Sequence, residues 1–250
     1  MLDLRSNYKL YLLLFALIIT LWIILTEYPF TINNIIPSPT LVYLSFYDLI
    51  SEYHFFINIL SSLTTVYGSM LICFIILKVK FPFLLIDSKP LKVILQLPSL
   101  FKFIPGIVIA VLLIYWFDKL FVIKLFYAII ITSAITFNKI LLMNKSKFSH
   151  YIDSVKSLGV SDFNINRRVI WKFVEPEIIN EYKSRNLYIW SSVIVFEFID
   201  NYEGIGFILR RALAYNDLSM IISLSIITAF VIFLGDKLIY LLKNKFYFWN

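Results

Sequence analysis

Two charged side chains inside long apolar runs are the residues best placed to do chemistry in this chain. Glu197 and Lys102 both lie within such runs, where inserting one charge into a bilayer costs at least about 2.5 kcal/mol. Each charge should therefore face protein or water. Together with Pro105, which removes a backbone hydrogen bond from the run that holds Lys102, they are candidates for lining a path for a polar solute.

A purely structural interpretation of both charges stays open. Lys102 would then reach the lipid headgroups through its long apolar stem or pair inside the protein. Glu197 would be hydrated near a membrane surface or paired with a basic residue close to it. The basic residues within reach by sequence are Lys119, Arg210 and Arg211.

The sequence contains no cluster of the residue types that catalyse reactions or bind metals. The single cysteine, Cys73, lies in an apolar run, and His54 and His150 are far apart in the chain, so neither a disulfide nor a cysteine or paired-histidine metal site is expected. No nucleophile has a base nearby, and the phosphate-binding pattern G-x-x-x-x-G-K-[ST] does not occur. We predict no catalytic residue, no metal and no cofactor in this chain, and an integral membrane enzyme is disfavoured.

The elements that position these residues are predicted to be membrane-spanning helices. Of the 250 residues, 60% are hydrophobic and 16% are charged, whereas about a quarter of an ordinary soluble domain is charged. A run of about twenty apolar residues crosses a bilayer, and the first run lacks the cleavage site of a signal peptide. We predict one all-α integral membrane domain over 1–250, with spans near 8–26, 56–77, 93–117, 120–143, 185–200 and 219–242.

Basic residues indicate how the chain crosses the membrane. If the connections alternate between two sides, 18 Lys and Arg fall on the side of both termini and of segment 144–184. Only four fall on the other side: Lys119, Lys124, Arg210 and Arg211. Because positively charged connections stay cytoplasmic, we predict cytoplasmic termini and a cytoplasmic 144–184 segment in a multi-pass cell-membrane protein. The net charge of +7 is explained by this orientation, and nucleic-acid binding is not expected.

Segment 144–184 has the pattern of two amphipathic helices joined at a glycine. The apolar residues of the first recur at helical spacing: Phe148, Ile152, Val155 and Leu158. Gly159 then suits a left-handed C-terminal cap, and Ser161 is placed to cap the second helix. That helix has apolar residues every four positions, Ile165, Val169 and Phe173, until Pro176 interrupts it. Such a module is expected to dock on a partner, or else to lie against the headgroups.

Residues 153–159 read Asp-Ser-Val-Lys-Ser-Leu-Gly, which resembles the cytoplasmic motif E-A-A-x-x-x-G of a known family. Lys172 stands at the first of the two prolines that follow this motif in the family, and Pro176 stands at the second. Further landmarks occur in the same order at 36–40, 62–63, 97–100, 104–105, 116–117, 197 with 204–206, and 235–236. The chain is similar to the permease subunits of binding-protein-dependent ABC importers, in particular those of the nitrate, sulfonate and taurine branch.

The resemblance implies an ATPase-coupling helix from Val160 to about Arg168. An amphipathic helix in a groove is anchored by a few apolar side chains, here Leu158, Val160, Phe163 and Ile165. The remaining coupling residues would be of two kinds. Asp153, Ser157 and Gly159 are positions of the motif itself. Asp162, Arg167 and Arg168 would make polar contacts at the edge of the groove.

The resemblance also implies partners for the chain. These are an ABC ATPase dimer that binds MgATP, a second permease copy in a homo- or heterodimer, an extracytoplasmic solute-binding protein and the bilayer. The solute would be small and anionic, sulfonate-like or similar to a thiamine precursor. The rival hypothesis is a stand-alone secondary carrier or channel that uses Lys102 and Glu197 and has no ATPase.

Overall fold

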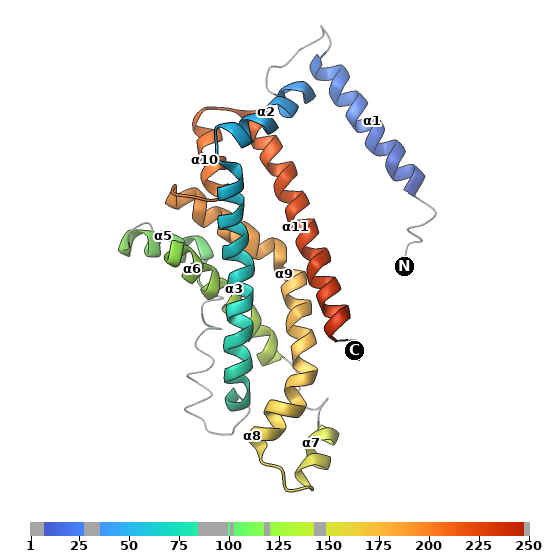
Figure 1. Ribbon diagram of the computed structural model, residues 1–250, viewed down its shortest axis with the longest axis vertical. Helices are drawn as coiled ribbons and strands as arrows, with labels where there is room; N and C mark the ends of the chain where they lie inside the picture. The colour runs from blue at the N-terminus through green and yellow to red at the C-terminus, as the bar shows by residue number, and fades with distance from the viewer. Residues whose placement is uncertain are drawn as a thin grey trace.

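The described part of the protein is built almost entirely from helices (Figure 1). The computed structural model describes residues 8–27, 36–84, 100, 103–117, 121–142 and 149–247, and no strand occurs within these ranges. The prediction of an all-α fold is confirmed. Lys102 and Lys119, and most of the predicted third span before residue 103, lie outside the described residues.

Four long helices form the central bundle. They are α3 (Phe55–Leu84), α6 (Phe121–Leu142), α9 (Trp171–Asp200) and α11 (Leu218–Phe246). Helix α9 packs against the other three, and α3 also packs against α6. The core between them holds buried apolar side chains such as Val66, Leu77, Ile189 and Trp190, so the bundle is held together where α9 meets its neighbours.

The predicted spans agree with the helices to different degrees. Residues 10–27, 55–83 and 218–246 are long and apolar enough to cross a membrane. Shorter apolar helices cover Gly106–Trp116, which is α5, and Phe121–Phe137 within α6. The number of six membrane spans therefore stays a prediction. Pro105 stands at the N-cap of α5, immediately before its first turn.

Two helices occur where the sequence led us to expect loops. Helix α2 (Pro39–Ser51) lies within the first predicted connection, and α10 (Ile205–Ala214) lies within the predicted 201–218 loop. The Ser38 side chain caps α2 by accepting a hydrogen bond from the Leu41 N–H, and Pro39 occupies the first turn. Ser followed by Pro is a known signal for the start of a helix, so α2 was readable from the sequence.

Segment 144–184 contains more helix than predicted. Helix α7 (Ser149–Lys156) is followed by Gly159 with φ of 74°, which confirms the left-handed conformation expected there. Helix α8 (Asp162–Ile165) continues through a π-helix (Asn166–Ile170) directly into α9. The prediction that Pro176 interrupts the second helix is wrong. Pro176 is buried inside α9, where packing by neighbouring helices makes a proline tolerable.

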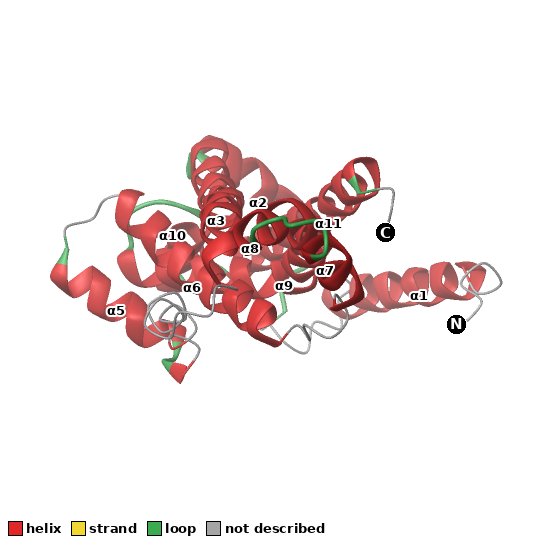
Figure 2. Ribbon diagram, turned by 90° about the horizontal axis from the view of Figure 1, so that it is seen from below, coloured by secondary structure: helices red, strands yellow, loops and turns green. Residues whose placement is uncertain are grey.

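The helices define two opposite ends of the molecule (Figure 1). Helices α2 and α10 lie at one end, here named the α2–α10 end, and α7 and α8 lie at the other, named the α7–α8 end. Helix α1 (Tyr8–Glu27) extends away from the bundle in both views (Figures 1 and 2). It contacts α2, and its apolar side chains are exposed along its length.

Candidate functional site

A buried ion-pair network lies at the α2–α10 end, where α3, α6 and α9 meet. Glu197, near the end of α9, is completely buried, and Lys124, near the start of α6, is 2% exposed. The Lys124 Nζ donates to Glu197 Oε1 at 3.2 Å and lies 3.5 Å from Glu203 Oε1. One ammonium group is therefore placed between two carboxylates, the second of which belongs to the α9–α10 connection.

The Glu197 carboxylate receives donors from three directions. The Ser62 Oγ donates to it at 2.7 Å, the Gly206 N–H donates to its other oxygen at 3.0 Å, and Lys124 supplies the third donor. A buried charge is destabilising unless it is paired and hydrogen-bonded. With these donors Glu197 meets both conditions without contact with water.

A second serine connects Lys124 to Glu203. The Ser61 Oγ donates to Glu203 Oε1 at 2.9 Å and accepts a hydrogen bond from Lys124. Glu203 is itself only partly buried. The network therefore runs from a fully enclosed carboxylate on α9 to a partly exposed carboxylate in the connection that follows it.

The same side chains hold the start of α10. The first N–H groups of a helix have no partner within the helix. Here the Gly204 N–H donates to Asn58 Oδ1 at 2.7 Å, and the Ile205 N–H donates to Ser62 Oγ at 2.9 Å. The Gly206 N–H donates to Glu197, whose negative charge is favourable at a helix N-terminus. Helices α3 and α9 thus fix where α10 begins.

The remainder of α10 is held against α9 by an arginine. Arg210 donates to the backbone carbonyls of Phe198 and Ile199 at 3.2 and 3.0 Å. These carbonyls lie near the C-terminus of α9, where a positive charge is favourable. Helices α9 and α10 consequently form a tight helical hairpin.

Two glycines make this close approach possible. Gly204 has φ of 110°, a conformation that other residues rarely adopt, and a Cβ there would overlap the Glu197 carboxylate. A Cβ on Gly206 would overlap the backbone carbonyl oxygen of Ile194. Both positions therefore require glycine for steric reasons.

The pairing of Glu197 differs from what the sequence suggested. Its partner is Lys124, which we had assigned to an outer connection. Arg210 binds backbone carbonyls instead, and the Arg211 guanidinium lies over the rings of Tyr53 and Phe207. Lys124 lies inside the predicted 120–143 span, and a lysine within a span was the available signal. Asn58 and Ser61 carried no such signal.

The predicted pathway residues are not brought together in the described part of the chain. Glu197 is enclosed, and Pro105 is exposed beside α5. Lys102 lies outside the described residues. A role of these three in a solute path stays a prediction.

The segment between α7 and α8 presents an exposed apolar surface at the other end. The Leu158 side chain is 78% exposed and Val160 is 37% exposed. Ser157, Asp162, Arg167 and Arg168 are exposed as well, and Asp162 pairs with Lys156 at 3.0 Å. Asp153 lies within α7. This exposed stretch is suitable for contact with another chain.

One of the predicted anchors in this segment faces the protein's own interior. Ile165 is buried in the main core, so it attaches the segment to the bundle and we correct the expectation for it. Phe163 is half-buried and its ring packs against that of Phe83 on α3 at 5.3 Å between centroids, so its role as an anchor stays a prediction. Leu158 and Val160 remain free to contact a partner.

The segment is firmly tied to two helices of the bundle. The Asn166 Nδ2 donates to the carbonyl of Pro82 at the end of α3, at 3.1 Å. The Trp171 ring packs against Phe81 and Phe74 of α3, at 5.2 and 5.8 Å between centroids. Because the segment also continues directly into α9, a displacement of it would move α3 and α9 together.

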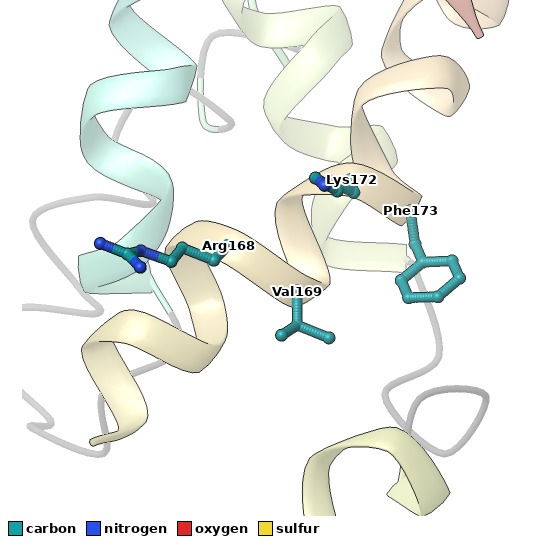
Figure 3. Close-up of a pocket in the computed structure, with 4 residues that line it drawn as sticks. All are labelled: Arg168, Val169, Lys172 and Phe173. Atoms are coloured by element: carbon teal, nitrogen blue, oxygen red, sulfur yellow. The ribbon is translucent and has the colours of Figure 1, made fainter. Parts of the chain in front are cut away.

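A pocket of about 400 Å³ opens beside this attachment and is lined by Arg168, Val169, Lys172 and Phe173 (Figure 3). Val169 and Phe173 point to the side on which α7 lies, whereas the Arg168 side chain extends to the other side of the helix. Lys172 contributes a second basic group to the lining of this pocket, in addition to Arg168.

Comparison with known proteins identifies the kind of molecule. Residues 84–246, well over half of the chain, match the model of a protein family described as binding-protein-dependent transport system inner membrane component. No curated protein and no solved structure matches the chain.

Proposed function

This chain belongs to the family of inner-membrane components of binding-protein-dependent transport systems, and we propose that it is the permease subunit of an ATP-driven importer. As a member of that family it is a multi-pass membrane transport component and not an enzyme. The chain has no phosphate-binding loop, so a separate ATPase would hydrolyse MgATP. The motif resemblance favours the nitrate, sulfonate and taurine branch and a small anionic, sulfonate-like or thiamine-precursor-like solute.

The observation that carries this proposal is the attachment of an exposed docking segment to a continuous helix. The segment around Leu158 and Val160 leads through α8 into α9, whose 30 residues extend over about 45 Å at 1.5 Å per residue. This length exceeds the roughly 30 Å hydrocarbon core of a bilayer. Closure of the two ATPase subunits at the α7–α8 end would thus be transmitted along α9 to the α2–α10 end. The membrane spans would then alternate between inward-open and outward-open states.

The distribution of basic residues supports one orientation of the proposed permease in the membrane. It favours cytoplasmic termini and a cytoplasmic α7–α8 end, so that the ATPase would dock there. A solute-binding protein would then approach the α2–α10 end from outside. A second permease copy, identical or different, would complete the path.

The environment of Glu197 bears on the rival hypothesis of a secondary carrier. A carboxylate that relays protons or binds a passing ion must exchange partners with water or solute. Glu197 is enclosed and bound by three donors, which favours a structural role. We therefore prefer the importer to a carrier that uses Glu197 as its charged relay.

The proposal is tested by asking which proteins remain bound to the chain. We would tag it, extract it in a mild detergent and identify co-purifying proteins by mass spectrometry. An ABC ATPase should be recovered with the unaltered chain and lost with Leu158→Asp. The matched control is Leu213→Asp, an exposed leucine of α10 at the α2–α10 end, which should retain the ATPase. Recovery of the chain alone in several detergents would refute the importer and favour a secondary carrier.

A further inference from the structure

Helix α2 has an exposed apolar face that no other described part of the chain covers. Four side chains form this face, named here the α2 outer face: Tyr43, Leu44, Tyr47 and Ile50. The two tyrosines are 75% and 72% exposed, and the two aliphatic side chains are more than half exposed. Their spacing of three and four residues places them on one side of the helix. Such a face requires a partner that accepts apolar side chains.

The opposite side of α2 is already occupied by the bundle. Val42, Ser45 and Leu49 are buried, and the helix packs against α11. The Ser223 Oγ donates to the Val42 carbonyl at 2.8 Å. This contact fixes how α2 is turned, so the α2 outer face must point away from the bundle.

Contacts with two apolar helices set the depth of α2 in the membrane. Ser223 lies five residues after the start of α11 at Leu218, about 7–8 Å along a helix that is long and apolar enough to cross a bilayer. At the other side, the Trp22 Nε1 of α1 donates to the Pro37 carbonyl at 3.1 Å. Glu27, the last residue of α1, accepts the Thr40 N–H at 3.1 Å. Helix α2 therefore lies at the same depth as the C-terminal end of α1 and the N-terminal part of α11.

The chemistry of the face matches the interface layer of a bilayer. Tyrosine and tryptophan are enriched at the level of the headgroups, because one part of each ring is apolar and another is polar. Helix α2 contains no Lys or Arg, and its one charged residue, Asp48, is half-buried. Binding would therefore depend on apolar contact and not on the charge of the headgroups.

We propose that the α2 outer face lies in the lipid headgroup layer at the α2–α10 end and binds phospholipid there. Helix α2 would be an interfacial helix between two spans. The exposed apolar surfaces of α1 and α11 flank it, so one lipid-covered surface continues across the three helices. The inference requires only that the chain is a membrane protein and does not depend on its solute or on an ATPase.

Spin-label accessibility tests this position directly. The only cysteine, Cys73, is buried and would be replaced by serine. A nitroxide would be attached to Tyr47→Cys, and to Tyr215→Cys as the matched control. Tyr215 is also an exposed tyrosine at the α2–α10 end, 68% exposed, but it precedes the Asp217 cap of α11. Collision rates with oxygen and with a water-soluble nickel chelate are then measured in phosphatidylcholine vesicles without other proteins.

The label at Tyr47 should collide several-fold more with oxygen than with nickel, and the label at Tyr215 should show the reverse. Tyr43→Cys, on the same face, should repeat the Tyr47 result, which guards against a local effect of one label. Equal nickel accessibility at Tyr47 and Tyr215 would place the face in water and overturn the proposal. Exclusion of both reagents at Tyr43 and Tyr47 would mean that protein, such as a second copy, covers the face, and would overturn it as well.

Lipid composition provides a second measurement. Replacing a third of the phosphatidylcholine by anionic phosphatidylglycerol should leave the Tyr47 accessibility ratio unchanged. A marked shift of the label toward the bilayer would contradict binding by apolar contact alone. None of these measurements involves transport, so their failure would be distinguishable from failure of the importer proposal.

Discussion

The two ends of the molecule use polar residues in opposite ways. At the α2–α10 end the charges of Lys124 and Glu197 are buried and paired, and backbone N–H groups of α10 complete the network. At the α7–α8 end Leu158 is exposed, while the ion pair of Lys156 with Asp162 lies at the surface. The first arrangement fixes three helices relative to one another, and the second leaves a surface free for a partner.

This difference indicates where substitutions should affect folding and where they should affect only docking. Removing one member of a buried ion pair leaves an uncompensated charge. Changing an exposed side chain usually alters stability by less than about 0.5 kcal/mol. The two ends should therefore respond differently to equally drastic substitutions.

The largest effect is expected at the centre of the network. Lys124→Met leaves Glu197 buried without its cation and should destabilise the folded protein by about 3–5 kcal/mol. Thermal unfolding in detergent, followed by fluorescence-detected size exclusion, measures this loss. The double variant Lys124→Met with Glu197→Gln removes both charges and should recover part of the stability. A single variant as stable as the unaltered protein would show that the pair does not hold the helices together.

The second effect concerns the close approach of α10 to α9. Gly206→Ala should destabilise the protein by about 1–3 kcal/mol, the usual cost of overpacking, because its Cβ would overlap the Ile194 carbonyl oxygen. Gly68→Ala is the matched control, since its Cβ would lie 3.6 Å from Leu125 Cδ1, an ordinary contact. Equal melting temperatures for the two variants would contradict the tight helical hairpin.

A smaller effect is expected at the turn of the docking segment. Gly159→Ala has space around its Cβ but must adopt φ of 74°, at a cost of about 1–2 kcal/mol. That cost falls on the local turn, so limited proteolysis between α7 and α8 should become faster while global unfolding changes less. Gly159→Asn, which tolerates this conformation better, should be cut more slowly than the alanine variant. The reverse order would argue against a left-handed turn.

The smallest effect on stability is expected at the exposed anchor. Leu158→Asp should change the unfolding free energy by less than about 0.5 kcal/mol while reducing ATP-driven uptake at least about tenfold if the segment docks on an ATPase. Ile165→Ala, a buried residue of the same region, should instead lower stability by about 2–5 kcal/mol. Full uptake by Leu158→Asp in a reconstituted system would remove this surface from the coupling interface.

Much of the helical architecture could be predicted because it depends on residues close together in the sequence. Apolar runs indicated where α1, α6 and α11 lie to within a few residues. Helical spacing before Gly159 predicted α7 and its left-handed termination. The start of α2 was also encoded locally, by Ser38 and Pro39, although we placed those residues in a connection between two spans.

The candidate site could be predicted only in part. Glu197 stood out because a charge in an apolar run needs a partner, and the landmark at 204–206 named the glycines beside it. Its actual partner, Lys124, is 73 positions away in the chain, and sequence spacing cannot indicate which of several cations approaches it. The interior role of Ile165 was missed for a related reason, because an apolar residue on an amphipathic helix can face its own core or a partner.

Hydropathy and helical periodicity were enough to predict an all-helical membrane protein with a glycine-terminated helical module, because both are properties of short stretches of chain. The pairing of Lys124 with Glu197, the continuation of α8 into α9 and the outward position of the α2 tyrosines became clear from the folded arrangement of the helices. These features depend on which helices meet and at what rotation, and that choice is made by packing across the whole bundle.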